Sequence, residues 1–190
     1  MQYHHDGYVG RNPQIRNAEG TGLNRSAELP ETMDVLIVGA GPAGIVQAAQ
    51  LTEYPEVHTR IIDARPQRLA AGRADGLFPR SCETFQAFEF YDEIAHEAAH
   101  MREMSFWGPH PENPAEIARG ARADDPPAYV SELPILTVNQ ARVIDYFAEY
   151  AENGPAKINV NYGYEFLDLE VEETGEYPVK VRLRDPAGKE

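Results

Sequence analysis

The sequence has little of what marks a secreted, membrane-embedded or nucleic-acid-binding protein. Cys82 is the only cysteine, so no internal disulfide can form, as is usual in the reducing cytoplasm. Only 17 Lys and Arg stand against 31 Asp and Glu, and the formal net charge is −14. This balance argues against partners such as nucleic acid or an anionic membrane. No apolar run reaches the roughly 20 residues of a membrane span. We therefore expect a cytoplasmic protein.

Four apolar residues run directly into a glycine-rich turn. The run Val35–Val38 predicts a strand buried on both faces, and the GAGPAG sequence of residues 39–44 follows it. Gly39 allows a tight turn, Gly41 lets the backbone approach a pyrophosphate, and Gly44 lets helix and strand pack closely. The free N–H groups and positive end of the next helix then face the phosphates. The pattern predicts a dinucleotide site.

The residues after the turn strengthen this prediction. A second apolar strand, residues 59–62, ends in Asp63, which lies 19 residues after Gly44. That is near the spacing expected for an acid on a ribose hydroxyl, and an acid here argues against a 2′-phosphate. NAD and FAD both satisfy this geometry. The alternatives at this point are an NAD-binding dehydrogenase domain and a nucleotide-binding module without catalysis.

The length of 190 residues allows one domain or two. We expect an irregular N-terminal arm over residues 1–32 and one incomplete domain over residues 33–190. Within it the patterns predict a helix to residue 54, a loop over 64–80, a helix over 81–101, a surface loop over 107–134, a helix from Asn139 to Gly154, a strand over 158–162 and a hairpin of 167–171 with 179–183. The final residues, Asp185–Glu190, resemble a turn that leads to another strand. We therefore expect the N-terminal part of a longer protein.

One motif points to different chemistry. His96–His100 matches the HExxH signature of zinc proteases. On a helix both imidazoles would share one face, with the intervening glutamate as general base. However, Ile94 and Met101 mark the predicted core face, so the histidines would point to solvent. We predict no metal site and keep a zinc hydrolase built on His96 and His100 as an alternative.

Two further segments narrow the interpretation. Gly72–Arg80 reads GRADGLFPR, and Val138–Arg142 reads VNQAR. Together with Asp34–Gly44, they resemble the single-component flavin-dependent aromatic hydroxylases, in the branch of phenol 2-monooxygenase and 3-hydroxybenzoate 4-monooxygenase. The glycine motif is shared with many flavoproteins, whereas GRADG and NQAR at this spacing are more specific. The resemblance covers nearly the whole chain.

The resemblance implies an α/β fold. This is a Rossmann-like FAD-binding domain of the glutathione-reductase type, with a β-hairpin, that stops before the substrate domain. The implied FAD-contacting residues are Gly39, Gly41, Pro42, Ala43 and Gly44 at the pyrophosphate; Asp63, Ala64 and Arg65 at the adenosine ribose; Gly72, Arg73, Ala74, Asp75 and Gly76 beside the flavin; and Gln140.

The resemblance also implies an activity. Members of this family use NADPH or NADH and O2 to hydroxylate a phenolic substrate through a flavin C4a-hydroperoxide. Asp75 matches an acid that engages the phenol hydroxyl, and we expect it to accept or orient that proton. The remaining partners are the rest of the same polypeptide and, in this branch, a second copy in a homodimer. These 190 residues alone are not expected to hydroxylate anything.

One departure from the family affects the substrate. The 3-hydroxybenzoate branch commonly carries a histidine where this chain has Ile135, and an isoleucine cannot hold a carboxylate. If Ile135 lines the pocket, phenol or a resorcinol-like diol fits better than a hydroxybenzoate. If Ile135 is a core residue, it says nothing of the substrate.

Overall fold

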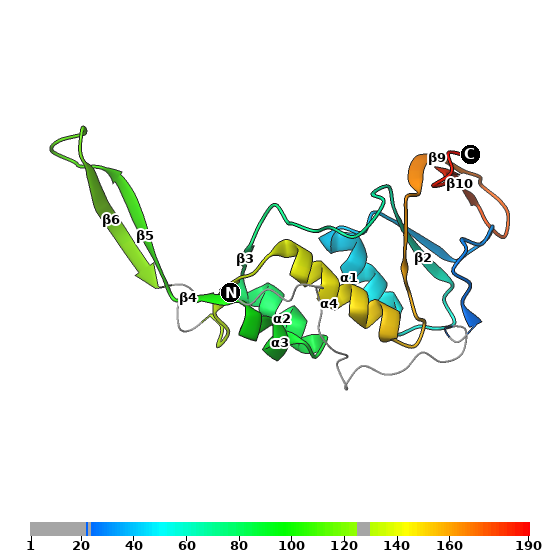
Figure 1. Cartoon of the computed structure of the whole chain (residues 1–190), viewed down its shortest axis with the longest axis horizontal. Helices are drawn as coiled ribbons and strands as arrows, with labels where there is room; N and C mark the ends of the chain where they lie inside the picture. Colours follow the sequence, from blue (N-terminus) through cyan, green and yellow to red (C-terminus); the bar gives the residue numbers. More distant parts are fainter. Residues whose placement is uncertain (1–21, 23, 125–129) are drawn as a thin grey trace. The chain divides into compact units, whose positions relative to one another are not determined.

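The computed structural model describes residues 22, 24–124 and 130–190, which divide into two compact units (Figure 1). One unit comprises Gly72–Gln140, and the other comprises the described chain up to Ala71 together with Ala141–Glu190. Most of the predicted arm over residues 1–32 lies outside the described residues, so the predicted domain boundary stays a prediction. No described helix is long and apolar enough to cross a bilayer.

The second unit is built on a three-stranded parallel sheet of strand order β1-β2-β8. The strands are β1 (Val35–Val38), β2 (Thr59–Asp63) and β8 (Val160–Tyr162). β2 is central, and its Ile61 and Ile62 are fully buried because both faces of the sheet are covered. The predicted strand-turn-helix-strand unit is thereby confirmed.

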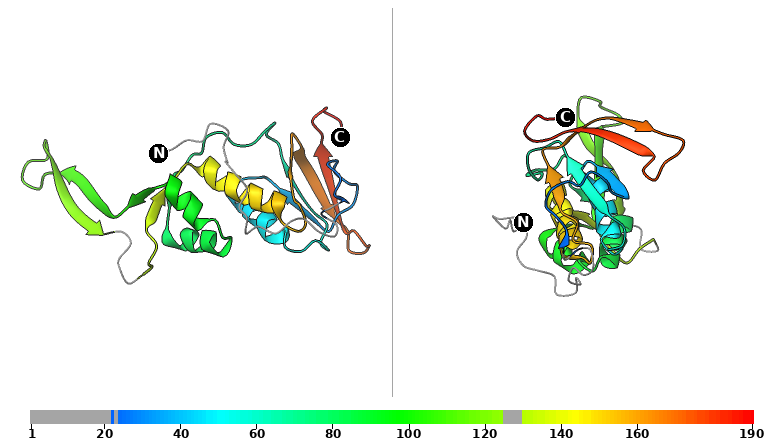
Figure 2. Two further views of the ribbon diagram at one scale, coloured as in Figure 1. Left: turned by 60° about the horizontal axis from the view of Figure 1, so that its bottom comes forward. Right: turned by 90° about the vertical axis from the view of Figure 1, so that its right-hand side faces the viewer.

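Two helices cover one face of this sheet. Helix α1 (Pro42–Leu51) connects β1 to β2, and α4 (Gln140–Asn153) precedes β8. Both crossovers progress in the same direction across the sheet, so right-handed connections place both helices on one side. Figures 1 and 2 show them side by side, where the Thr52 hydroxyl donates a hydrogen bond of 2.8 Å to the Ala151 carbonyl. A Cβ at Gly154 would lie 2.4 Å from Thr52 Cγ2, so this close approach needs glycine.

A hairpin of β9 (Glu165–Val171) and β10 (Val179–Arg184) completes this unit, as predicted. A cavity of about 560 Å³ separates it from β1, and apolar side chains line both walls. They include Leu36 and Val38 of β1 and Leu169, Val179 and Val181 of the hairpin. The unit therefore has three layers, which are helices, parallel sheet and hairpin (Figure 2).

The first unit holds a small antiparallel sheet of order β3-β7-β4. Its strands are β3 (Gly76–Leu77), β7 (Ile135–Thr137) and β4 (Ala99–Met101), and it also contains α2 (Pro79–Ala87) and α3 (Tyr91–Glu97). β7 is the central strand.

The single helix predicted over residues 81–101 is wrong. The chain breaks between α2 and α3 at Glu89, which has a positive φ of 61°. Phe88 and Phe90 are two residues apart, so on a straight helix they would point in nearly opposite directions. The break lets both be buried, and Phe90 packs on Phe85 with ring centroids 5.4 Å apart.

The surface loop predicted over residues 107–134 is also wrong in part. β5 (Glu103–Pro109) and β6 (Ile117–Asp124) form an antiparallel hairpin there. Its pairing register shifts between Ser105 and Trp107, which is typical of a β-bulge. Most residues of β5 are exposed, so the Pro, Ala and charged residues of this stretch carry no clear apolar alternation that would predict a strand.

Candidate dinucleotide site

The turn after β1 has the geometry that its glycines predict. Gly39 has a φ of +98°, a left-handed conformation that other residues rarely adopt. A Cβ at Gly44 would lie 1.9 Å from the Gly39 carbonyl oxygen. Only glycine lets α1 pack this closely on the turn, so Gly39 and Gly44 shape the turn itself.

Gly41 has a different environment. It precedes α1 with a φ of −77° and a ψ of −176°, which any residue adopts, and a Cβ there would meet nothing within 4 Å. No side chain caps the helix, whose first-turn N–H groups have no partner within the helix. Pro42 at the first helical position lacks an N–H, so Ala43 and Gly44 present theirs. The space over Gly41 and these donors fit a pyrophosphate.

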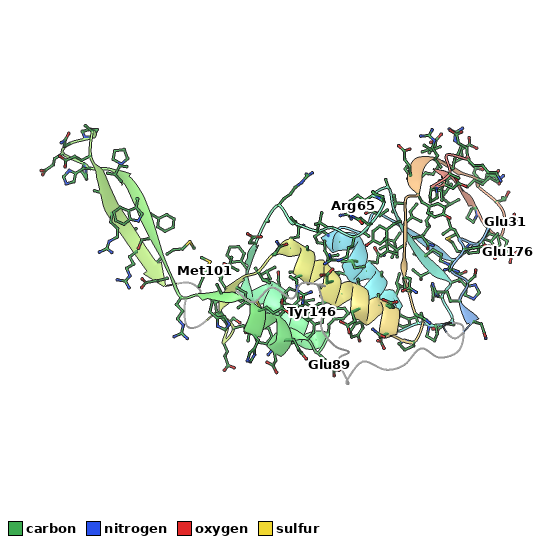
Figure 3. All side chains as sticks on the ribbon, in the orientation of Figure 1. Glu31, Arg65, Glu89, Met101, Tyr146 and Glu176 are labelled. Carbon is green, nitrogen blue, oxygen red and sulfur yellow. The ribbon has the colours of Figure 1, made fainter. Side chains whose placement is uncertain are left out.

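Asp63 ties the end of β2 to this turn. Its Oδ2 accepts hydrogen bonds of 2.7 Å from the Ala40 backbone N–H and from the Arg65 guanidinium. Its Oδ1 accepts two bonds of 2.8 Å, from the backbone N–H and the Nε of Arg65. Arg65, labelled in Figure 3, also donates to the Ala40 carbonyl at 3.1 Å. The carboxylate therefore has all four of its usual acceptor positions filled.

These contacts change the chemistry of Asp63. The Arg65 guanidinium, hydrogen-bonded to it, is the main cause that lowers the pKa of Asp63 to about 2, although burial acts in the opposite direction. The spacing from Gly44 predicts that Asp63 binds a ribose hydroxyl. In this structure Asp63 instead holds the glycine turn in shape. A contact from Asp63, Ala64 or Arg65 to the ribose stays a prediction.

In the other unit, the loop that contains Gly72–Gly76 is fastened to the start of α4. The Arg73 N–H donates to Gln140 Oε1 at 2.9 Å, and the Gly72 N–H donates to Asn139 Oδ1 at 3.2 Å. A Cβ at Gly72 would lie 2.2 Å from the Gln140 Cβ, so this contact needs glycine. The GRADG segment is therefore held by Asn139 and Gln140, the first two residues of the NQAR segment.

Asp75 lies in this loop with an exposed side chain. Its carbonyl accepts a hydrogen bond of 2.9 Å from the Val138 N–H, beside the pairing of β3 with β7. Over residues 24–124 and 130–190, its carboxylate has neither a hydrogen bond nor an ion pair. Asp75 is thus open to a ligand, whereas Asp63 is saturated.

The HExxH segment does not form the geometry that a zinc protease needs. Helix α3 ends at Glu97, and Ala98 is extended with a ψ of 153°, so His100 lies on β4 rather than one turn after His96. Within the described part of the chain, no group of three His, Cys, Asp or Glu side chains has the arrangement to hold a metal ion.

Cys82 is buried, which raises the pKa of its thiol to about 11.

A model of a known protein family matches most of the chain. It is described as an FAD binding domain and covers residues 32–189. The chain belongs to this family. FAD, rather than NAD, is therefore the dinucleotide of the fold, and the open space over Gly41 with the free helix N-terminus fits its pyrophosphate.

The chain is also similar in sequence to two named monooxygenases. The chain is 39% identical over 184 residues to 3-hydroxybenzoate 4-monooxygenase of Comamonas testosteroni, and the match covers 96% of this chain but 29% of that protein. It is 38% identical over 77 residues to phenol 2-monooxygenase fsqG of Aspergillus fumigatus, covering 40% and 13%. The chain thus spans less than a third of the length of each of these relatives. The resemblance to this family that the sequence motifs predict is confirmed.

Solved structures share the fold of this FAD binding domain. The flavin-dependent monooxygenase PieE, in complex with FAD and substrate, matches with a TM-score of 0.67 at 23% identity over 85% of this chain and 28% of its own. The p-nitrophenol 4-monooxygenase PnpA from Pseudomonas putida matches with a TM-score of 0.64 at 17% identity, over 93% and 38%. The predicted fold class is therefore confirmed.

Proposed function

We propose that this chain is the N-terminal portion of an FAD-dependent monooxygenase that hydroxylates a phenolic substrate with NAD(P)H and O2. The observation that carries the proposal is the 39% identity to a 3-hydroxybenzoate 4-monooxygenase over 96% of this chain. The phenolic substrate and O2 follow from that relative, and the reductant from the earlier family resemblance.

The FAD-binding residues in this proposal act in two groups. Gly41, Ala43 and Gly44 bind the pyrophosphate through backbone N–H groups at the start of α1. Gly72–Gly76, held by Gln140, pass beside the flavin. Bound FAD supplies the redox chemistry that couples oxidation of NAD(P)H to activation of O2.

Asp75 supplies the proton chemistry. The carboxylate accepts the proton of the substrate hydroxyl, the O–H bond breaks, and its electron pair stays on the phenolate oxygen. A phenolate ring is far more electron-rich at its ortho and para carbons than the neutral phenol, so it attacks an electrophilic oxygen more readily. A positioned base of this kind contributes about 10²–10⁴-fold to a rate. The open carboxylate of Asp75, in contrast to that of Asp63, supports the assignment.

The test is steady-state hydroxylation by the full-length Asp75→Asn and Asp75→Ala variants. We expect turnover to fall by about 10²–10⁴-fold while the flavin spectrum shows normal FAD content. Asp92→Asn, which changes an exposed acid on α3, is the matched control and retains activity. Near-normal turnover of both Asp75 variants would remove this residue from the reaction.

The substrate is assigned here by its phenolic ring alone. Ile135 is 3% exposed in the central strand β7, as a core residue would be. Its burial supports the alternative in which Ile135 is a core residue, and a core residue gives no preference among phenols. A panel of phenol, resorcinol and 3-hydroxybenzoate identifies the substrate, and no stimulation of NAD(P)H oxidation by any phenol would contradict the proposed class.

A homodimer and a cytoplasmic location complete the proposal. The first follows from the family branch and the second from the single cysteine. Light scattering of the full-length protein and cell fractionation test them separately.

A further inference from the structure

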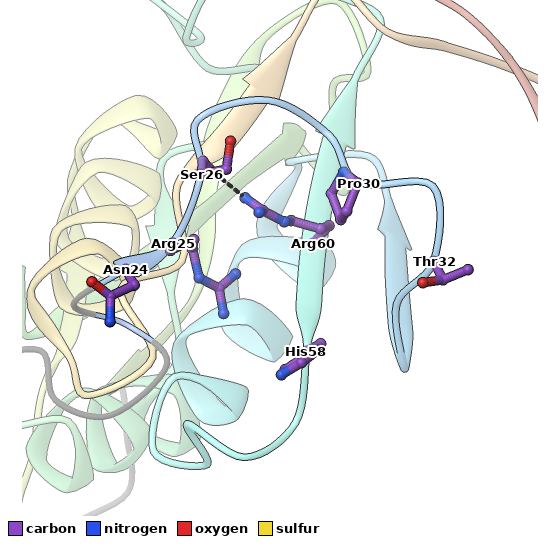
Figure 4. Close-up of a pocket in the computed structure, with 7 residues that line it drawn as sticks. All are labelled: Asn24, Arg25, Ser26, Pro30, Thr32, His58 and Arg60. Atoms are coloured by element: carbon purple, nitrogen blue, oxygen red, sulfur yellow. Dashed lines mark hydrogen bonds between the residues drawn. The ribbon is translucent and has the colours of Figure 1, made fainter.

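A polar cavity of about 450 Å³ lies at the start of β2, at the opposite end of this strand from Asp63. Its polar lining residues are Asn24, Arg25, Ser26, Thr32, His58 and Arg60 (Figure 4). β2 rises about 3.3 Å per residue, so its two ends are about 13 Å apart. The cavity and the glycine turn therefore lie at opposite ends of the parallel strands.

Two arginines approach each other across this cavity from different segments. Arg25 comes from the chain before β1 and donates through Nη1 to the Thr59 carbonyl. Arg60 comes from β2 and donates through Nη1 to the Ser26 carbonyl at 2.8 Å, the bond drawn in Figure 4. Both acceptors are neutral. Each guanidinium has five N–H donors, so most of them stay available for a ligand.

The charge of this pair is not balanced by the described residues. Within residues 24–124 and 130–190, neither Arg25 nor Arg60 forms an ion pair with a carboxylate, although the chain has 31 acidic residues. Burial, and secondarily the charge of Arg60, lower the pKa of Arg25 to about 10, and burial also lowers the pKa of Arg60. Two partly desolvated like charges are unfavourable unless an anion accompanies them.

We propose that this cavity binds a phosphate group, carried either by orthophosphate or by a small phosphorylated molecule. The planar guanidinium fork matches phosphate oxygens in bidentate hydrogen bonds. Ser26, Thr32 and Asn24 line the same cavity, and their hydroxyl and amide groups are further hydrogen-bond donors. A tetrahedral anion uses donors from several directions, whereas a planar carboxylate uses fewer.

Isothermal titration of the full-length, FAD-loaded protein tests the proposal. Loading with FAD fills the pyrophosphate turn, so that phosphate cannot bind there. At constant ionic strength, we expect inorganic phosphate to bind at one saturable site and acetate to bind at least tenfold more weakly. Tighter binding of AMP than of phosphate assigns the site to a phosphorylated molecule, and equal or weaker binding of AMP assigns it to orthophosphate.

Variants separate binding from folding. Arg60→Gln is expected to weaken phosphate binding at least tenfold, but it also removes the bond to Ser26. Thr32→Asp leaves the hydrogen bond between Arg60 and Ser26 in place, because it puts a carboxylate at an exposed position of the cavity lining. It should abolish phosphate binding without lowering the unfolding temperature, whereas the neutral control Thr32→Asn retains binding. No saturable phosphate binding by the wild type, or unchanged binding by Thr32→Asp, would overturn the proposal.

Discussion

At the scale of single residues, two acids that the sequence singles out lie in contrasting environments. The spacing in the sequence singles out Asp63, and the family resemblance singles out Asp75. The sequence could not predict that Arg65, two residues further on, fills the carboxylate of Asp63, because this depends on how the chain turns after β2. Nor could it predict that the Asp75 side chain is exposed.

The three glycines of the turn can be separated by substitution. Gly44→Ala would place a Cβ 1.9 Å from the Gly39 carbonyl oxygen, so we expect loss of folding stability together with loss of FAD binding.

Gly41→Ala would place a Cβ that meets nothing within 4 Å, so the variant should fold normally. Its methyl group nevertheless occupies the space through which a pyrophosphate approaches. We expect FAD affinity to fall by roughly tenfold or more, about 1.4 kcal/mol. Fluorescence titration with FAD and thermal unfolding of the apoprotein measure the two effects. Unchanged FAD affinity in Gly41→Ala would contradict the assigned position of the pyrophosphate.

The Asp63–Arg65 pair predicts a pH dependence of stability. The pKa of Asp63 falls from 3.8 to about 2 on folding, so its contribution is fully present above about pH 4 and is lost as the pH falls toward 2. This corresponds to about 2 kcal/mol at pH 7. We expect Asp63→Asn to lower the free energy of unfolding in urea by about that amount at pH 7. The difference from wild type should shrink between pH 5 and pH 3.

The control for this experiment is Asp168→Asn on β9. Asp168 is exposed and pairs with Arg182 at 3.3 Å, so its substitution should change stability by less than about 1 kcal/mol. A gap between Asp63→Asn and wild type that stays constant down to pH 3 would refute the role of the ionised carboxylate.

At the scale of elements, the start of α4 holds the loop that carries Asp75. Gln140 accepts a hydrogen bond from the Arg73 N–H, and Gln140→Leu removes that acceptor. A lost hydrogen bond of this kind contributes about 0.5–1.5 kcal/mol, so we expect FAD affinity to fall by roughly two- to tenfold. Gln140→Glu keeps an acceptor oxygen and should bind FAD nearly as wild type does. If both variants weaken FAD equally, Gln140 acts through a direct contact of its amide NH2 with FAD instead.

Strands with a clear run or alternation of apolar residues could be predicted from the sequence. Features that depend on tertiary packing could not. The apolar run of β1 and the alternation in β9 and β10 are local signals, and the structure confirms them. The break at Glu89 depends on the burial of Phe88 and Phe90 together, which no local period encodes. The β5–β6 hairpin was missed because its strands carry much Pro, Ala and charge, which are also typical of loops.

At the scale of the whole molecule, the apolar cavity between β1 and the β9–β10 hairpin has consequences for the isolated chain. β1 has one strand neighbour among the described strands, and Val38, Leu169 and Val179 are 52%, 48% and 50% exposed. Exposed apolar surface of this kind binds hydrophobic dyes and favours association. We expect the 190-residue chain alone to enhance the fluorescence of 8-anilinonaphthalene-1-sulfonate far more than the full-length protein does, per mole. Leu169→Lys should reduce the signal. Equal fluorescence per mole from both would contradict the expectation.

The central claim is that these residues begin an FAD-dependent aromatic monooxygenase. The most direct measurement is ¹⁸O₂ incorporation by the purified full-length protein with FAD, NAD(P)H and the phenol panel. The account predicts one ¹⁸O atom in a hydroxylated product, with NAD(P)H oxidation stimulated by the phenol that is hydroxylated. NAD(P)H oxidation that no phenol stimulates, with no labelled product, would contradict it.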